Sequence, residues 1–499
     1  MSSSSPARTP FIWLLLITAL AVSVQGYHLG ADDAAIYVPG IKQAADPALY
    51  PFGGEFFQSH ARLTVLPLLV GGSARLTRVP VDWMIFAWHV AGVFLLMLAS
   101  WRLLCAFFEH ESARWGGVAL LAALLTVPVA GTALAIADPY VTSRTLSTPA
   151  TIFAIACWAN GQRKQAAAWW LLTALIHPQM SVYAAVFVGC LAVVTRRVAV
   201  RSGHAPAAGL AYLAGFPFLF ELQPARGPAR EALLSRTYFF VSQWAWYEWL
   251  GVLAPLVLLG WIAKADLRGT KPAFRSSALS LTLFGVLFTL AGIVLTFSAR
   301  LENYTRLQPM RSLHLIYVIF FLMLGGLVGE YTLRQHVWRW LALFLPLGVA
   351  MGLQQVSDYP ASAHVEWPGT AAANSWSAAF LWIRDNTPKD AVFALDPGYM
   401  SIPGEDMHGF RAVAERSMLA DAVKDSGAVS LFPGLAEEWK AEVESTQGWK
   451  HFELANFEKL AGQYPVTWFV TGLPGPAGLL CPYHNQAVAV CQLPVVTAH

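Results

Sequence analysis

Long apolar segments recur along the first 353 residues, and no other feature constrains the fold of this chain as strongly. Hydrophobic residues make up 56% of the 499 residues and charged residues only 13%, and the mean hydropathy is +0.48. Such a chain is too apolar for a soluble enzyme and too long for one membrane hairpin. The sequence therefore predicts an α-helical polytopic membrane protein.

The apolar runs predict about eleven spans. Nine fall at about 11–24, 83–107, 115–137, 148–160, 207–221, 246–263, 277–298, 312–330 and 338–353, and two more share the segment 166–195. That segment is long enough for one span, but it has Arg163 and Lys164 before it and Arg196 and Arg197 after it. Because positive clusters favour the cytoplasmic side, we expect a hairpin that turns at His177.

With a cytoplasmic N-terminus, eleven spans place the C-terminus outside the cytoplasm. We therefore expect a transmembrane domain over residues 1–353 of an inner (cytoplasmic) membrane and an extracytoplasmic α/β domain over 354–499. The charge distribution changes at the same boundary, with 25 Lys and Arg against 14 Asp and Glu before it and 8 against 16 after it. The basic residues flank apolar spans and form no run with interleaved aromatic residues, so no nucleic acid is expected as a partner.

The C-terminal domain has the patterns of a small α/β unit. Helices are expected at 374–386, 408–415, 435–444 and 452–463, and strands at 391–395, 416–420, 466–471 and 487–493. Cys481 and Cys491 are candidates for a disulfide if this domain lies in an oxidising compartment. The other three cysteines lie within or at the ends of apolar spans.

Two adjacent carboxylates, Asp32 and Asp33, follow the first apolar segment. A carboxylate beside the hydrocarbon layer is costly, and it generally serves binding, proton transfer or catalysis. The alternative is that the pair caps the next helix and solvates a loop. The pair opens a first outer loop, residues 27–81, whose amphipathic pieces at 34–45 and 56–76 are expected to lie on the membrane surface.

Arginine is unusually frequent in the segments expected on the outer face: Arg62, Arg75, Arg78, Arg144, Arg226, Arg230, Arg236, Arg300, Arg306 and Arg311. The planar guanidinium group of arginine can donate two parallel hydrogen bonds at once, which suits the oxygens of a phosphate. If the outer loops converge, Asp33 and Asp32 are the catalytic candidates, and a substrate with a phosphate head and a lipid tail is expected. The candidates that bind it are His60, Arg144, His177, Glu302, Arg306, Arg311 and His314.

Each of these candidates also has a structural interpretation. Arg311 can be a residue at a span end that extends its charge to the interface. His177, before Pro178, can be a buried histidine bonded to a carbonyl that the proline leaves free.

A short cytoplasmic start, an acidic pair after the first span, a long amphipathic outer loop and a soluble C-terminal domain together resemble the GT-C superfamily of membrane glycosyltransferases, and among these the bacterial members most. The segment from Trp382 to Phe393 also resembles the opening of the soluble domain in many such proteins. The resemblance implies transfer of a hexosyl or pentosyl group from a polyprenyl-phosphate donor to an acceptor on the outer face. It assigns Asp32 or Asp33 as the base or a metal ligand, and the outer arginines as phosphate ligands.

The sequence departs from parts of the superfamily pattern. It has no WWDYG-type signature of oligosaccharyltransferases, and its later outer loops hold only the isolated acids Asp138 and Glu302. A divalent cation is therefore left open as a cofactor. The alternative functions are a transporter or flippase of a lipid-linked or anionic solute, and a non-catalytic scaffold of the cell envelope. The chain has no evident repeat between its halves and keeps its charges at one face, which favours the transferase over a carrier.

Overall fold

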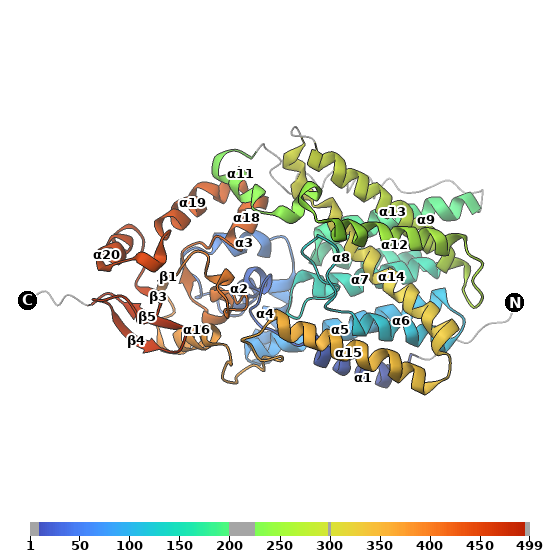
Figure 1. The fold of residues 1–499 in the computed structure, drawn as a ribbon, viewed down its shortest axis with the longest axis horizontal. Coiled ribbons are helices and arrows are strands. Elements are labelled where there is room, and N and C mark those ends of the chain that lie inside the picture. Colours follow the sequence, from blue (N-terminus) through green and yellow to red (C-terminus); the bar gives the residue numbers. More distant parts are fainter. Residues whose placement is uncertain (1–8, 199–224, 298–300, 495–499) are drawn as a thin grey trace, which may run out of the picture.

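The computed structural model describes residues 9–198, 225–297 and 301–494, which form a helical body with a smaller α/β unit at one end (Figure 1). Six described helical segments are long and apolar enough to cross a membrane: α5 (Val81–Phe107), α9 (Pro178–Val198), α12 (Trp246–Lys264), α13 (Pro272–Phe297), α15 (Val337–Asp358) and the stretch Glu302–Leu333, which contains α14 (Leu313–Val328). Many of their apolar side chains face outward, and Leu341 and Leu345 on α15 are 61% and 66% exposed. An apolar outer surface of this kind fits lipid rather than water. The protein is thus a polytopic membrane protein.

Shorter helices pack among these six: α1 (Phe11–Gln25), α6 (Glu111–Ala123), α7 (Ser143–Ala159) and α8 (Arg163–Ile176). In the described part of the chain, ten of the expected spans therefore contain a helix. The expected span at 207–221 lies outside the described residues. The number of eleven crossings stays a prediction, because only six helices meet the length that a crossing requires.

The segment 166–195 forms two helices, as expected from its flanking charges. Helix α8 ends at Ile176 and α9 begins at Pro178, and the indole of Trp170 donates a hydrogen bond of 2.9 Å across the turn to the carbonyl of Ser181. The predicted helix at 115–137 is wrong in its second half, because α6 ends at Ala123. The chain then forms a turn in which Pro128 pairs with Ala135, and proline has no N–H to continue a helix.

The first loop, residues 27–81, lies between the helical body and the C-terminal unit (Figure 1). Its first amphipathic piece is helical as expected, in α2 (Ala34–Ala45). The second piece is divided into α3 (Glu55–Ala61) and α4 (Leu66–Thr77). Pro67 lies in the first turn of α4, where proline is favoured because its missing N–H is not needed. A new helix therefore begins there, and α3 and α4 do not form one continuous helix.

The C-terminal unit, residues 359–494, begins where α15 ends. Its sheet has the order β2-β1-β3-β5-β4, in which β1 runs parallel to β2 and β3, and β5 runs antiparallel to β3 and β4. The strands are β1 (Val392–Ala394), β2 (Ser417–Met418), β3 (Trp468–Gly472), β4 (Leu480–His484) and β5 (Val488–Gln492). The helices are α16 (Ser375–Asn386), α17 (Phe410–Ala414), α18 (Asp425–Leu431), α19 (Ala436–Ser445) and α20 (Leu454–Gln463).

All eight elements expected in this unit are present with shifted ends, but α18 and β4 were not expected. Helix α18 is short, and its Ser and Gly residues have no helical pattern in the sequence. Helix α11 (Gly227–Leu234), from the chain between the spans, packs against α18 and α19. The unit is therefore covered by a segment that the sequence assigns to the membrane domain.

Short helical turns complete the chain: η2 (Thr237–Phe239), η3 (Val241–Gln243), η4 (Glu302–Leu307), η5 (Pro309–Ser312), η6 (Gly329–Leu333), η7 (Tyr399–Ser401), η8 (Pro433–Leu435) and η9 (Trp449–His451).

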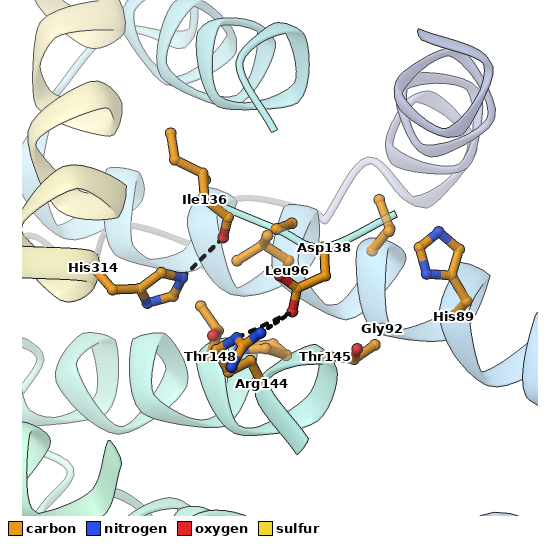
Figure 2. A pocket seen from close by; sticks show the side chains of 12 residues that line it. His89, Gly92, Leu96, Ile136, Asp138, Arg144, Thr145, Thr148 and His314 are labelled. Atoms are coloured by element: carbon orange, nitrogen blue, oxygen red, sulfur yellow. Dashed lines mark hydrogen bonds and ion pairs between the residues drawn. The ribbon is translucent and has the colours of Figure 1, made fainter. Parts of the chain in front are cut away.

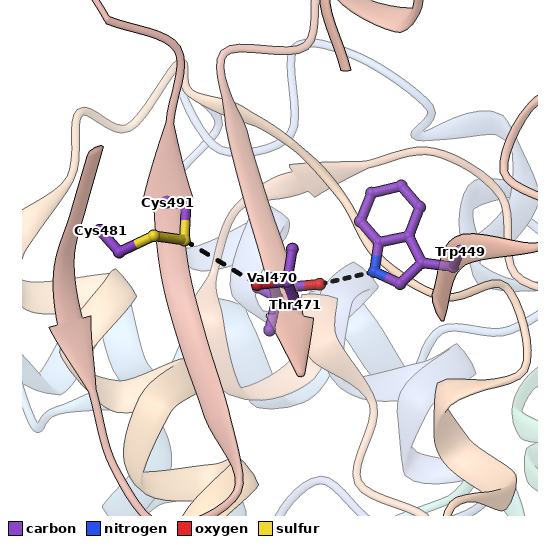
Figure 3. Close-up of a disulfide and its surroundings, with 5 residues drawn as sticks. All are labelled: Trp449, Val470, Thr471, Cys481 and Cys491. Carbon is purple, nitrogen blue, oxygen red and sulfur yellow. Dashed lines mark hydrogen bonds between the residues drawn. A yellow bond between two sulfur atoms is a disulfide. The ribbon is translucent and has the colours of Figure 1, made fainter. Parts of the chain in front are cut away.

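The expected disulfide joins Cys481 on β4 to Cys491 on β5 (Figure 3). The indole of Trp449 donates a hydrogen bond of 3.0 Å to the carbonyl of Val470 on the adjacent strand β3. The remaining cysteines, Cys105, Cys157 and Cys190, are free thiols of the helical body. A disulfide in this unit fits a domain outside the reducing cytoplasm.

This arrangement predicts the number of accessible thiols in the unfolded protein. Alkylation in denaturant without reductant should modify three of the five cysteines, and all five after reduction, as measured by intact mass. A variant with Cys481→Ser and Cys491→Ser should give three modified cysteines under both conditions. Five modified cysteines in unreduced wild-type protein would contradict the disulfide.

Candidate functional site

The acidic pair lies where the helical body meets the C-terminal unit. Asp33 is the residue that precedes α2, but its side chain makes no capping hydrogen bond to that helix. The Asp33 carboxylate therefore does not act as the helix cap that the alternative interpretation requires. It faces two cations instead.

Asp33 is held between Arg144 of α7 and Lys424 of the C-terminal unit. Arg144 Nη2 lies 3.0 Å from Asp33 Oδ2, and Lys424 Nζ lies 3.1 Å from Asp33 Oδ1. Burial raises the pKa of the Asp33 carboxyl, but the Lys424 ammonium and the Arg144 guanidinium outweigh burial and hold this pKa well below its usual range. Asp33 is therefore ionised at neutral pH.

Asp32 shares the Lys424 ammonium. Lys424 Nζ donates a hydrogen bond to Asp32 Oδ1, and the Tyr140 hydroxyl donates to Asp32 Oδ2 at 2.8 Å. Asp32 has a φ of +49°, a left-handed conformation that aspartate adopts more readily than most residues. This turn brings two successive carboxylates to one lysine.

Arg144 is positioned by a second carboxylate, Asp138. Arg144 Nε and Nη2 lie 3.0 and 2.9 Å from Asp138 Oδ2, and the Thr142 hydroxyl donates to the same oxygen at 2.9 Å. Asp138 and Arg144 line a small cavity inside the helical body (Figure 2). His314 lines it too, and its Nε2 lies 2.9 Å from the carbonyl oxygen of Ile136.

Lys424, which sequence analysis missed, is held by a network of buried carboxylates. It directly precedes α18, and Arg411 Nη1 lies 2.9 Å from each oxygen of the neighbouring Asp425. Four residues before Lys424, the N–H of Ala420 donates a hydrogen bond of 2.6 Å to Glu442 Oε2 on α19. The ammonium of Lys424 is therefore presented by a rigid loop.

Three predicted residues, His60, His177 and Arg311, line a second cavity. Tyr37 and Ser143 line it as well, and the Ser143 hydroxyl donates a hydrogen bond of 3.1 Å to the Tyr37 hydroxyl.

The acidic pair is next to this second cavity. Tyr37, on α2, lies one helical turn after Asp33, so both side chains point to the same side. Ser143 is the residue directly before Arg144, the partner of Asp33.

Polar atoms in this second cavity lack protein partners. Arg311 Nε and Gln308 Oε1 are buried, and neither has a hydrogen-bond partner among the described residues. Burial lowers the pKa of His60 to about 4, so its imidazole is neutral at neutral pH. Because buried polar groups normally find a partner, this cavity has the chemistry to bind a polar, anionic group.

The other predicted residues lie apart from this constellation. Glu302 pairs with the exposed Arg230, at 2.8 and 3.0 Å, and not with the acidic pair or the second cavity. Arg306 has a buried side chain in η4. Arg236 donates to the carbonyl of Val423, and so belongs to the support of the Lys424 loop.

The remaining outer arginines are Arg62, Arg75, Arg78 and Arg226, which are exposed, and Arg300, which lies outside the described residues. Convergence of the outer loops thus involves Arg144 and Arg311, and not the whole set of arginines.

No protein-family model matches this chain, and no curated protein matches it. Among solved structures, the chain is similar to ArnT from Cupriavidus metallidurans in the apo state. The identity is 13% and the TM-score is 0.42, with 96% of each chain covered.

The buried Glu442 predicts a pH dependence of stability. Burial raises the pKa of Glu442 to about 7, above the usual value of about 4.3 for a glutamate in an unfolded chain. The stability that Glu442 contributes as a neutral acid is fully present below about pH 4 and is lost as the pH rises through about 7. We expect Glu442→Gln to raise the melting temperature in detergent at pH 8, by the equivalent of about 1–3 kcal/mol, and much less at pH 5.

The matched control is Glu437→Gln, an exposed glutamate on the same helix. It should leave the melting temperature nearly unchanged at both pH values. An equal gain for Glu442→Gln at pH 5 and pH 8 would show that Glu442 is not the titrating group.

Proposed function

We propose that this protein is a membrane glycosyltransferase that moves a sugar from a polyprenyl-phosphate donor to an acceptor outside the cytoplasm. The observation that carries the proposal is Asp33, ionised between Arg144 and Lys424 beside the cavity that contains Arg311. An ionised carboxylate, several cations and a buried Arg311 Nε without a partner among the described residues fit a reaction in which a hydroxyl loses a proton and a phosphate leaves.

The second cavity is proposed to hold the donor phosphate. Arg311 supplies a buried N–H group without a partner among the described residues, and the neutral His60 supplies a further hydrogen-bonding group. Both groups bind the polyprenyl phosphate more strongly as it gains negative charge on leaving the sugar. Because this binding is stronger in the transition state than in the bound donor, it lowers the activation barrier of the transfer.

The lipid tail of the donor is proposed to lie along α8 and α4. Leu63 and Thr64 line the second cavity and also an adjoining open groove, which Leu68 and Leu175 line. Leu68 is 72% exposed and Leu175 is 50% exposed, so the adjoining groove has an apolar wall. A phosphate site next to an exposed apolar surface suits a lipid-linked phosphate.

Asp33 is proposed as the base. A carboxylate clamped by two cations is a weak base, because its pKa is far below that of the group it must deprotonate. An acceptor hydroxyl that takes the place of Lys424 Nζ removes one of these cations, and the pKa of Asp33 then rises. Lys424 can keep its hydrogen bond to Asp32 while Asp33 is released.

The reaction then balances at Asp33 and at the phosphate. The acceptor oxygen forms a bond to the anomeric carbon, and its proton passes to Asp33. The bond between that carbon and the phosphate oxygen breaks, and its electron pair stays on the phosphate, which Arg311 stabilises.

The proposal includes a membrane orientation. We place the N-terminus in the cytoplasm and the C-terminal unit outside it, in an inner membrane. The disulfide of the C-terminal unit and the excess of basic residues before residue 354 support this orientation.

Replacement of the base should abolish turnover. With a radiolabelled hexosyl or pentosyl polyprenyl phosphate that the wild-type protein consumes in vesicles, Asp33→Asn should lower the rate by at least about 100-fold, because the amide cannot accept the proton. The matched control is Asp46→Asn, since Asp46 also forms an ion pair with a lysine of the C-terminal unit, Lys389, but on the exposed surface.

The control should retain the wild-type rate. Unchanged turnover in Asp33→Asn would remove Asp33 from the role of base. A wild-type protein that moves the lipid-linked sugar across the vesicle membrane without breaking its phosphate bond would instead establish the transporter alternative.

Replacement of Arg311 should weaken binding of the phosphate. We expect Arg311→Gln to raise the Kd for polyprenyl phosphate by at least about tenfold, as measured by native mass spectrometry, because a charge-assisted hydrogen bond is lost. The control is Arg75→Gln, an exposed arginine on α4, which should bind as the wild-type protein does. Equal affinity in Arg311→Gln would place the phosphate elsewhere.

A further inference from the structure

Three side chains from distant parts of the chain meet at a point separate from the acidic pair and both cavities of the site. They are His28, which follows α1, Glu366, which follows α15, and His408, which precedes α17. One imidazole nitrogen from each histidine and one oxygen of Glu366 all lie within 4.8 Å of one another. His28 and His408 are almost completely buried, at 0% and 1% exposure.

His28 is buried without a partner for its ring nitrogens. Neither Nδ1 nor Nε2 has a hydrogen-bond partner among the described residues, and Nδ1 lies 3.8 Å from Glu366 Oε1. The ring is stacked on Tyr359 with 3.8 Å between centroids, which holds the imidazole plane toward the other two side chains. A fully buried imidazole that is oriented but unsatisfied points to a missing partner.

The other two side chains are oriented by neighbouring backbone groups. His408 Nδ1 lies 2.9 Å from the carbonyl oxygen of Glu405 and donates to it, and His408 Nε2–H donates to Glu366 Oε1, 2.8 Å away, so a metal ion bound between them would replace the Nε2 proton. The N–H of Leu29 donates to Glu366 Oε2 at 3.1 Å, so Oε1 is left for the cluster. Hydrogen bonds of this kind orient the ligands of protein metal sites.

We propose that His28, Glu366 and His408 bind a divalent metal ion, Zn²⁺, through His28 Nδ1, Glu366 Oε1 and His408 Nε2. Two imidazoles and one carboxylate are a ligand set that zinc accepts. Ligand atoms at about 2.0–2.1 Å from a tetrahedral zinc lie about 3.3 Å apart. The distances of 2.8 and 3.8 Å from Glu366 Oε1 bracket that spacing, so small side-chain rotations complete the site.

The fourth coordination position is assigned to water. Glu366 and His408 both line a cavity that opens to solvent, which gives the metal ion a path to the site and room for a water ligand.

The metal ion would tie the loop of the acidic pair to the C-terminal unit. The N–H of Gly409 donates to the carbonyl of Gly30 at 2.9 Å, and the N–H of Asp32 donates to the carbonyl of Met407 at 2.8 Å. His28 and His408 thus flank the backbone contacts that place Asp32. The site is structural in this proposal, and it does not depend on the proposed glycosyl transfer.

The test is a measurement of metal content on the full-length protein in detergent. After incubation with ZnCl₂ and gel filtration, elemental analysis of wild-type protein should give about one zinc per chain. His28→Gln and Glu366→Gln should each lower this content at least about fivefold, since each removes one ligand. The matched control is His110→Gln, because His110 Nδ1 also lies 2.7 Å from a glutamate oxygen, of Glu330, at the far end of the body.

A second measurement does not depend on the variants. Cobalt incorporated into wild-type protein should give the visible absorption of four-coordinate Co²⁺, and zinc should displace it. Zinc content below about 0.1 per chain in wild-type protein, or equal content in wild-type and His28→Gln protein, would overturn the proposal. The first outcome would leave an ion pair between His408 and Glu366, and the second would place the metal ion elsewhere.

Discussion

The structure depends on one charge contact between the helical body and the C-terminal unit, the contact of Lys424 with Asp32 and Asp33. Lys424 lies 392 residues from Asp32 and 391 from Asp33 in the chain; Lys424 is buried and the two carboxylates are partly buried. Burial of charge is tolerated only where each charge has partners, because desolvation costs several kcal/mol per ion. Asp32, Asp33 and Asp138 meet Lys424 and Arg144, so each charge in this group has a partner of opposite sign.

The interface repeats this principle away from the acidic pair. Lys42 lies on α2, the helix that the acidic pair precedes. Its side chain is completely buried, and its Nζ lies 2.8 Å from both Asp82 and Glu415. Asp82 lies in the first turn of α5 in the body, whereas Glu415 follows α17 in the C-terminal unit. Breaking such a contact leaves an unpaired buried charge, which is strongly unfavourable. The C-terminal unit is therefore docked in one position, and the site forms where the two parts meet, as ligand sites commonly do.

Local patterns in the sequence were sufficient for several parts of this arrangement. The apolar runs, the position of the acidic pair before an amphipathic helix, the turn at His177 and the disulfide all depend on residues close in sequence. Lys424 could not be found in this way, because its role comes from a tertiary contact and α18 has no helical pattern. Glu302 was grouped with Arg306 and Arg311 because they are neighbours in sequence, but its side chain turns to Arg230 instead. The helix predicted over 115–137 ends at Ala123, and the chain then turns where Pro128 pairs with Ala135, because proline has no N–H with which to continue a helix.

The same contacts explain why the chemistry of Asp33 is tied to docking. Arg144 comes from the start of α7 in the body and is held there by Asp138. Lys424 comes from the C-terminal unit, and its loop is held by Arg411 and Glu442. Because each nearby cation lowers the pKa of a carboxyl, the proton affinity of Asp33 depends on Lys424 of the C-terminal unit as well as on Arg144 of the body. The basicity of this carboxylate is thus a property of the interface, and not of the acidic pair alone.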